Sequence, residues 1–420
     1  MKVFKFGGAS IKDADAVRNM CNIVEHYSND KLLIVVSAMG KSTNALEKIL
    51  ELCRNKENFE GAIDSLNTFH QDIIKDLFGN KNQDISTEVS AIFKELSNYL
   101  NAIDSLEGRI NESYDWVVST GEIVSSKIIQ QYLEERFPIV WLNARSVLKT
   151  DNSFREAKVN WDLTRQYIND QVRPILEKKV IITQGFIGST RNDKPTTLGR
   201  EGSDFTGAIF ANCLNAESLT IWKDVPGILN ADPKIIKDAE KYEQLSYSDA
   251  AEMTYYGASV IHPKTIKPLT SRNIPLLVRS FTHPFDKGTV IDGHESTKNK
   301  PAIIFKKNQS LITFGVRDFT FINERNLSLI FHTLDLLNIK INLMQNSAIS
   351  FSICIDNQPW KIESLIKKLS NDFDLKFNNN NLTLISVKNY IPENIEKLSK
   401  EKEIYLEQRT QKTFQIVVKS

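Results

Sequence analysis

The segment from residue 180 to residue 213 constrains the fold of this chain more than any other. Its first four residues, Val-Ile-Ile-Thr, predict a buried strand, and residues 205–213 predict a helix. A glycine-rich loop lies between them, and Ser203 and Asp204 are the expected N-cap of the helix. Glycines let the backbone approach a ligand, and a helix start offers free N–H groups with partial positive charge. The segment therefore predicts an anion-binding loop.

Arg200 and Asp204 are the candidate functional side chains of this loop. The planar guanidinium of Arg200 suits a carboxylate or a phosphate, and Asp204 places a carboxylate beside it. The alternative is an ordinary capped connection between strand and helix, in which Arg200 has no functional role. We keep this alternative because glycine-rich loops recur by chance. The segment alone does not decide between the two.

The N-terminus has the same arrangement of strand, glycine turn and helix. Residues 3–6 predict a strand that carries Lys5 and ends at Gly7 and Gly8. The residues that follow have apolar side chains at helical spacing. The chain therefore begins with β, turn, α.

The next predicted strand, residues 32–36, ends in a polar loop with two candidate hydroxyl groups. Residues 40–42 read Gly-Lys-Ser, but Val35 stands where a phosphate-binding P-loop has its first glycine, so we reject that motif. Ser37 and Thr43 either cap the following helix or hold a polar substrate.

Residues 45–110 are polar with an apolar stripe at helical spacing, which predicts a helical insertion over one face of the sheet. Residues 116–121 then predict an apolar strand that closes on a glycine, followed by Glu122. Glu122 either belongs to the site or is the acidic first-turn residue of the next helix.

The remaining pattern predicts an α/β fold. Further strands are expected at residues 137–143, 218–223, 274–280 and 288–291, with helices between them. This alternation over about 290 residues predicts a mostly parallel sheet with helices on both faces. The candidate side chains lie where strands end and helices start, the edge at which such sheets bind ligands. His262 is expected to satisfy a backbone group, because no triad or metal cluster surrounds it.

Composition narrows the possible partners. The 420 residues are 41% hydrophobic and carry a net charge of +1, so no global field attracts nucleic acid or an anionic membrane. The apolar runs are strand-sized, and we expect neither a signal peptide nor a membrane span. The four cysteines lie far apart, which favours a reducing cytoplasm and argues against structural zinc.

Together the motifs resemble those of the aspartate kinases, members of the amino-acid kinase family. The residues that carry the resemblance are Lys5–Gly8, Ser37, Thr43–Asn44, Thr120–Glu122, Gln184–Phe186, Leu198–Asp204, Trp222–Gly227, Tyr256–Ala258 and Ile261–Pro263. The resemblance covers essentially the whole chain and implies a catalytic domain over residues 1–296.

The resemblance implies transfer of the γ-phosphate of ATP to the side-chain carboxylate of L-aspartate, the first step toward lysine, threonine and methionine. Lys5 and Asp204 would be catalytic. The aspartate site would comprise Ser37, Thr43, Glu122, Phe186, Arg200, Glu201, Gly202 and Ser203. The ATP site would comprise Lys5, Phe6, Gly7, Gly8, Ser10, Lys223, Asp224, Leu229, Lys234, Ser259 and Val260. Mg²⁺ would enter with ATP, without a metal bound tightly to the protein.

Four positions depart from the family pattern. They are Ala9 where Thr is usual, Glu201 where Gly is common, Leu229 where Tyr is found, and Ser259 where Lys is frequent. Glu201 is tolerable if its side chain faces solvent. Lys264 or Lys267 is a candidate for replacing the charge that Ser259 lacks.

Residues 300–420 predict a second domain. The order βαββα is followed by a polar linker at 378–381 and a shortened second copy, which resembles the paired α+β, ferredoxin-like ACT regulatory domains of aspartate kinases. The resemblance implies a homodimer or higher homo-oligomer with lysine or threonine bound between chains around residues 318–328 and 342–347. The alternative is a dimerisation module without a ligand, because Arg325, Asn342 and Ala348 replace usual residues.

Two alternatives to a monofunctional aspartate kinase stay open. One is another member of the family, acting on glutamate, N-acetylglutamate or UMP. The other is a catalytically weak amino-acid-binding regulator, which the departures at Ala9 and Ser259 favour. The sequence shows no G-x-G-x-x-G segment, so we expect no fused homoserine dehydrogenase.

Overall fold

The computed structural model describes residues 1–81, 83–103, 108–258, 261–294, 300–317 and 320–419. By its contacts the chain divides into two compact units. The first comprises Met1–Ile228, Lys241–Ala251 and Val260–Glu295, and the second comprises Leu229–Glu240, Glu252–Ser259 and Ser296–Ser420. The second unit thus includes two short segments of the expected catalytic domain. Within the described residues, no helix is both long and apolar enough to cross a membrane.

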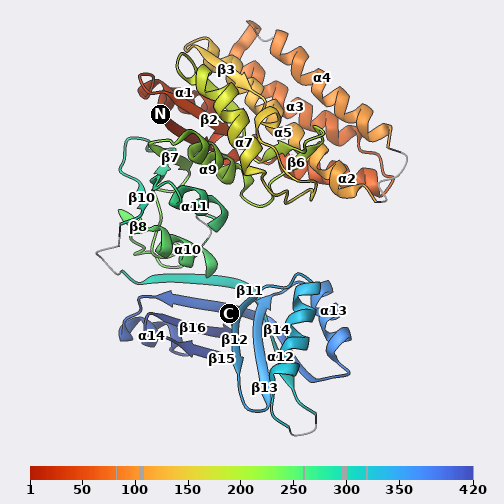
Figure 1. The fold of residues 1–420 in the computed structure, drawn as a ribbon, viewed down its shortest axis with the longest axis vertical. Helices are drawn as coiled ribbons and strands as arrows, with labels where there is room; N and C mark the ends of the chain where they lie inside the picture. Colours follow the sequence, from red (N-terminus) through yellow and green to blue (C-terminus); the bar gives the residue numbers. More distant parts are fainter. Residues whose placement is uncertain (82, 104–107, 259–260, 295–299, 318–319, 420) are drawn as a thin grey trace. The chain divides into compact units, whose positions relative to one another are not determined.

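An eight-stranded sheet forms the centre of the first unit (Figure 1). Its strands are β1 (Lys2–Phe6), β2 (Leu32–Val36), β3 (Ile139–Leu142), β4 (Val180–Gln184), β7 (Ser218–Lys223), β8 (Gln244–Ser246), β9 (Leu276–Ser280) and β10 (Thr289–Asp292). They lie in the order β3-β4-β2-β1-β7-β9-β10-β8, and only β9 and β10 pair antiparallel. The predicted mostly parallel sheet is confirmed, with β8 as an addition.

Helices cover both faces of this sheet. The described helices of the first unit are α1 (Ala14–His26), α2 (Ser42–Arg54), α3 (Glu60–Phe78), α4 (Gln83–Asn101), α5 (Ile110–Glu134), α6 (Ala144–Val147), α7 (Trp161–Tyr167), α8 (Arg173–Leu176), α9 (Gly202–Leu214) and α11 (Pro263–Thr270), together with the start of α10 (Tyr247–Tyr255). Phe4 and Phe6 of β1 belong to the same core as α1 and α5. Lys5 points to the opposite face, where it pairs with Asp204 of α9, because successive side chains of a strand alternate.

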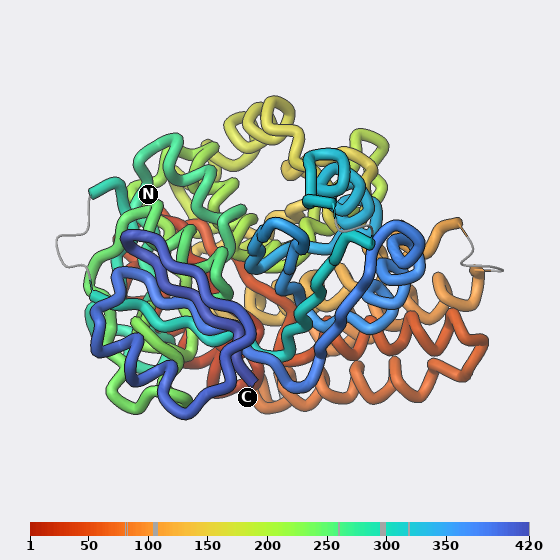
Figure 2. The backbone as a smooth tube through the Cα atoms, turned by 90° about the horizontal axis from the view of Figure 1, so that it is seen from below, coloured from red at the N-terminus to blue at the C-terminus, as the bar shows by residue number. Residues whose placement is uncertain are grey.

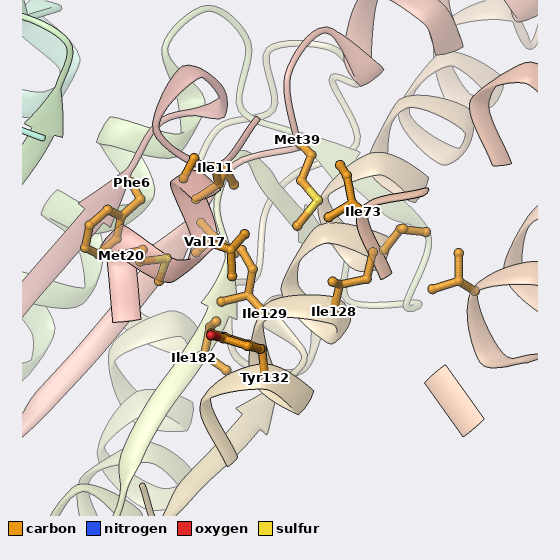
Figure 3. Close-up of a cluster of buried hydrophobic side chains, with 14 of the residues drawn as sticks. Phe6, Ile11, Val17, Met20, Met39, Ile73, Ile128, Ile129, Tyr132 and Ile182 are labelled. Atoms are coloured by element: carbon orange, nitrogen blue, oxygen red, sulfur yellow. The ribbon is translucent and has the colours of Figure 1, made fainter. Parts of the chain in front are cut away.

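The core between the sheet, α1 and α5 is continuous (Figure 3). Ile128, Ile129 and Tyr132 of α5 gather with Val17 of α1 and Ile182 of β4. These side chains are nearly fully buried. Their burial fixes the position of α5 against the sheet, because large apolar groups in a close-packed interior tolerate little displacement.

One predicted strand is wrong. Residues 116–121 lie inside helix α5, and Glu122 is a mid-helix residue, not a helix cap. The segment is buried on almost every side, between the sheet and the insertion helices. A helix that is buried all round lacks a polar face, so its apolar run cannot be told from a strand by periodicity alone.

Helices α2, α3 and α4 lie in the segment where the sequence predicts a helical insertion. Helices α3 and α4 form an antiparallel pair, coloured orange in Figure 2. Both pack on α5, which in turn contacts β2, β3 and β4. The insertion therefore covers the sheet through α5, as an outer layer.

The second unit contains a six-stranded antiparallel sheet. Its elements are β11 (Ala302–Gly315), α12 (Glu324–Leu336), β12 (Ile341–Asn346), β13 (Ser350–Asp356), α13 (Pro359–Leu369), β14 (Asp374–Lys388), α14 (Pro392–Ser399), β15 (Ile404–Arg409) and β16 (Thr413–Lys419). The strand order is β12-β13-β11-β14-β16-β15. The predicted order βαββα and the shorter second copy are found, and the ferredoxin-like fold class is confirmed.

The predicted linker at residues 378–381 is wrong. These residues belong to β14, which with β11 runs through both halves of the sheet (Figure 1). The pairing shifts register near Gln309, where Asn308 and Asn381 both have positive φ angles of 56° and 53°. Asparagine tolerates this conformation, so the polar run indicates an irregularity inside a strand. Residues 302–306 pair with 384–388 and so supply the second copy with an additional strand.

Candidate active site

A cavity of about 720 Å³ lies at the carboxyl ends of β1, β2, β4 and β7 in the first unit. Its lining residues are Lys5, Gly8, Ser37, Ala38, Gly40, Thr43, Tyr114, Glu122, Arg155, Glu156, Phe186, Gly199, Arg200, Glu201, Gly202, Ser203, Asp204 and Lys223. Every residue predicted for catalysis or for the aspartate site is among them. The parallel sheet brings these residues together because consecutive strands deliver their carboxyl ends to one edge.

Two lysines and one aspartate form the charged centre of the cavity. Lys5 Nζ lies 2.6 Å from Asp204 Oδ1, and Lys223 Nζ lies 3.5 Å from Asp204 Oδ2. Burial by itself would raise the pKa of Asp204, but the charges of Lys5 and Lys223 outweigh it and hold the pKa below its ordinary value. Asp204 is therefore an anion, and the trio retains one positive charge in excess for a negatively charged ligand.

The position of Lys5 follows from the strand and from its neighbour on α9. Alternation along β1 directs Lys5 away from the Phe4 and Phe6 core. A Cβ added to Gly207 would lie 3.0 Å from Leu219 Cδ1 and 3.7 Å from Lys5 Cβ. The glycine thus lets α9 approach the strands closely, which brings Asp204 within reach of the lysine.

Gly8 brings two loops of the cavity into contact. A Cβ at Gly8 would lie 2.7 Å from the carbonyl oxygen of Ala38, and Gly40 N donates to Gly8 O at 3.1 Å. No side chain fits at such a distance. The glycine predicted to let the backbone approach a phosphate also lets the loop after β1 contact the loop after β2.

The start of α9 differs from the prediction. Glu201 is the N-cap residue, with φ 54°, and Ser203 and Asp204 lie inside the first helical turn, so their prediction as the N-cap is wrong. Their side chains are consequently free to face the cavity instead of closing the helix. The positive φ explains why glycine suits position 201. Glu201 is half-buried, and its Oε2 is a buried atom without a hydrogen-bond partner in the described structure. The side chain therefore does not meet the expectation that it faces solvent.

Glu122 is a buried carboxyl group in the wall of the cavity. Burial raises its pKa to about 8, although the Ala38 backbone N–H, Arg145 and Lys5 each act in the opposite direction. Its Oε2 accepts no hydrogen bond from the described part of the chain. An added cation, such as an ammonium group, would therefore find a ready partner in Glu122.

The sequence reasoning missed Tyr114, Arg155 and Glu156. Asp115, which is fully buried, accepts the Arg155 backbone N–H with both carboxylate oxygens at 2.9 Å and the Thr197 hydroxyl at 2.6 Å. The Arg155 guanidinium lies over the Tyr114 ring, 4.2 Å from its centroid. No local motif marks these residues, because the fold brings them to the cavity from α5 and from a loop about 40 residues later.

The predicted ATP residues are distributed differently. Lys5, Gly8 and Lys223 line the cavity, and a Cβ on Gly7 would lie 3.5 Å from Lys5 Nζ. The Phe6 ring does not: it is fully buried and stacks on Trp222, with ring centroids 5.9 Å apart. Ser10 donates to the Trp222 carbonyl at 3.3 Å, and Asp224 is exposed.

For four of the predicted ATP residues, the structure gives no position relative to this cavity. Leu229 and Lys234 belong to the second unit, and Ser259 and Val260 lie outside the described residues. Lys264 and Lys267, the candidates for a replacement charge, line a different cavity of the first unit. His262 is the N-cap of α11 and accepts the Lys264 backbone N–H, in agreement with its expected role.

The fold and this cavity define an α/β protein with a cation-rich anion site at the carboxyl edge of a parallel sheet. The model of the amino acid kinase family matches residues 1–280. Lysine-sensitive aspartokinase 3 of Escherichia coli strain K12 is 32% identical over 360 residues, which span 84% of this chain and 78% of that protein. The chain therefore belongs to the amino acid kinase family, and within it to the aspartokinases.

Solved structures agree with this assignment. The crystal structure of E. coli aspartokinase III with aspartate and ADP, in the R-state, has a TM-score of 0.85 and 28% identity. The same enzyme with lysine and aspartate, in the T-state, has a TM-score of 0.81 and 27% identity. Each match covers 100% of this chain and 96% of the other. The chain spans only 33% of a bifunctional aspartokinase/homoserine dehydrogenase of Zea mays that is 32% identical over 310 residues.

Proposed function

We propose that this chain is an aspartate kinase, which transfers the γ-phosphate of ATP to the side-chain carboxylate of L-aspartate and releases ADP and 4-phospho-L-aspartate. The observation that carries the proposal is the buried Lys5–Asp204 pair in a cavity that also holds Glu122 and Arg200. The similarity to an aspartokinase structure with aspartate and ADP supports both substrates.

The chemistry requires charge neutralisation more than proton transfer. The aspartate side chain has a pKa of about 3.9 and is already ionised at neutral pH, so it needs no general base. One of its oxygens attacks the γ-phosphorus while the bond to the β-phosphate oxygen breaks. Lys5 would neutralise the charge on the transferring group, and Asp204 would orient Lys5 without taking a proton.

The aspartate backbone groups would be recognised on the other wall. Arg200 is exposed at the rim, and its planar guanidinium suits the α-carboxylate. Glu122 suits the α-ammonium, because that cation would lie beside the carboxyl oxygen that lacks a partner in the described residues. Ser37, Thr43, Phe186, Gly202 and Ser203 complete the proposed aspartate site.

Mg²⁺ would arrive with ATP as part of the substrate. Within the described residues, no group of three or more His, Cys, Asp or Glu side chains is arranged to hold a metal ion. Both oxygens of Asp204 already face lysines. The donor set therefore fits a nucleotide complex that brings its own metal, with Lys5, Gly7, Gly8 and Lys223 facing the phosphates.

Regulation by lysine is the corresponding proposal for the second unit. The E. coli relative is named lysine-sensitive, and its T-state structure contains lysine, which favours lysine over threonine. Asn342 is 8% exposed and bonds to Gln309 at 2.7 Å and Asp356 at 2.9 Å, so it is committed to a buried network. The proposed effector region is therefore residues 320–328 and 343–347, at a homodimer contact. Asp318, part of the expected region, lies outside the described residues. A cytoplasmic location stays a prediction.

The decisive experiment uses the full chain with ATP, Mg²⁺ and hydroxylamine, which traps an acyl phosphate as a hydroxamate. We expect a hydroxamate with aspartate and none with glutamate or N-acetylglutamate. The Asp204→Asn variant provides the matched control and should lose most of the product. A product with glutamate instead, or none with aspartate, contradicts the proposal.

A further inference from the structure

A second cavity of the first unit, of about 410 Å³, is lined by residues of α7, α9 and α11 and of the segment before α7. It is distinct from the candidate active site, with which it shares only the lining residue Glu156. No residue to which we assign a role in the aspartate kinase reaction lines this cavity. Three features of its walls indicate what it binds.

The first feature is an unpaired oxygen on a buried side chain. Asn212 of α9 lines the cavity and is 4% exposed. Its Nδ2 donates to Pro268 O at 2.8 Å and to Ser271 Oγ at 3.0 Å, whereas Oδ1 has no partner in the described part of the chain. The amide orientation is fixed, since the reverse would place Oδ1 against a carbonyl oxygen. A buried acceptor without a donor is costly, which points to a ligand that supplies one.

The second feature is uncompensated positive charge. Arg165 of α7 forms no ion pair with a described carboxylate, and its buried Nε has no partner in the described residues. Lys158, Lys264 and Lys267 also line the cavity, against a single acid, Glu156. Among the described residues, Lys264 Nζ donates only to the Leu198 carbonyl, at a long distance of 3.5 Å. A small anion would therefore gain several donors.

The third feature is an apolar wall. The rings of Trp161 and Phe205 meet edge to face, with centroids 6.4 Å apart and an interplanar angle of 69°. Pro268, Ala157 and Val159 extend this surface. Water alone would satisfy the polar atoms but would leave these groups wetted, whereas a flat apolar body would cover them.

We propose that this cavity binds a small aromatic carboxylate that carries a hydrogen-bond donor. The carboxylate pairs with Arg165, supported by Lys264 and Lys267. The ring covers Trp161, Phe205 and Pro268, and the donor bonds to Asn212 Oδ1. The inference is independent of the proposed kinase activity, because it concerns a separate cavity and a binding measurement.

The test is calorimetry on the full chain with 4-hydroxybenzoate, in the presence of saturating ADP, Mg²⁺ and aspartate to fill the active-site cavity. We expect a Kd below about 1 mM. The neutral analogue 4-hydroxybenzamide should bind at least about tenfold more weakly because it lacks the charge, and benzoate should bind more weakly because it lacks the donor. A crystal of the complex should contain the ring against Trp161.

Matched variants distinguish binding in this cavity from nonspecific attraction of the ligand to positive charge on the protein surface. Arg165→Gln and Lys267→Gln should weaken 4-hydroxybenzoate binding, by about tenfold and threefold respectively. Arg173→Gln, on the exposed part of α8, should leave the Kd unchanged. Lys267 is exposed, so its variant tests the proposal even if Arg165→Gln fails to fold. Absence of binding at about 10 mM, equal binding of the benzamide, or unchanged binding in either cavity variant that folds overturns the proposal.

Discussion

Asp115 holds the backbone N–H of Arg155 with both carboxylate oxygens, at 2.9 Å each, and so ties a cavity loop to helix α5. Arg155 has a φ angle of 58°, a conformation that needs such support. Asp115→Asn should therefore loosen the loop and raise the aspartate KM severalfold, with a smaller effect on kcat. Steady-state kinetics measure this split. Asp151→Asn is the control, because Asp151 is a half-buried carboxylate of the same loop that does not line the cavity; equal KM changes in both variants would contradict the assigned role.

Lys5→Met should remove about 2 to 4 kcal/mol of transition-state stabilisation, because Lys5 is the proposed charge on the transferring phosphate. The aspartate KM should change much less. Lys2→Met on the same strand is the matched control, since Lys2 pairs with Asp30 outside the cavity. Near-normal turnover in Lys5→Met would refute the assignment, provided that thermal unfolding verifies the fold.

Arg200→Ala should raise the aspartate KM more than it lowers kcat. The proposed contact with the α-carboxylate would be made in both the ground state and the transition state, and loss of such uniform binding affects mainly KM. Arg191→Ala, which is exposed and lines a different cavity, should behave like the unaltered chain. If the ATP KM rises instead of the aspartate KM, Arg200 belongs to the nucleotide site.

The pKa of Glu122, about 8, predicts a pH-dependent aspartate KM. In the proposed site the ionised form of Glu122 would bind the α-ammonium, so the aspartate KM should be about eightfold lower at pH 8.5 than at pH 7. Glu122→Gln should weaken binding and abolish this dependence. A KM that does not vary with pH in the unaltered chain would count against the proposed role.

The same carboxyl group links stability to pH. Its folded-state pKa lies above the ordinary value of 4.5, so the folded state holds a proton that the unfolded state releases. This contribution to the free energy of unfolding is fully present below about pH 4.5 and is lost as the pH rises through 8. Denaturant titrations at pH 6 and pH 8.5 measure how much of the free energy of unfolding is lost between these pH values. This loss should be smaller in Glu122→Gln than in the unaltered chain.

Glu201→Gly should stabilise the chain by about 0.5 to 1 kcal/mol, because it relieves a left-handed conformation and removes a half-buried carboxylate. Glycine is also an accepted N-cap residue. Glu135→Gly is the control: Glu135 caps the end of α5 with a φ angle of −65°, so its replacement should destabilise. A lower midpoint of denaturation for Glu201→Gly would show that its side chain makes a contact that compensates for the strain.

Local sequence by itself determined the parts of this site that depend on strand ends and helix starts. Lys5 before Gly7 and Gly8, and Arg200 to Asp204 around the start of an apolar helix, were predictable because strand alternation and helix termini are properties of short segments. The mostly parallel direction of the strands was predictable from their alternation with helices. The resemblance selected the site role from the two that the local pattern left open for Glu122, and it added Phe186, to which no local pattern gave a role.

Only the tertiary structure decided the rest. Residues 116–121 lie in a helix although their apolar run resembles a strand, because burial on all sides selects apolar residues without imposing a helical period. Residues 378–381 lie within a strand because Asn378 and Leu382 pair with Leu311 and Gln309 of β11, across a register shift. Tyr114 and Arg155 reach the cavity, and Asp115 holds Arg155 there, through long-range contacts that no local pattern records. The pKa of Glu122 likewise depends on the desolvation that packing imposes, which is a property of the folded chain and not of the residue.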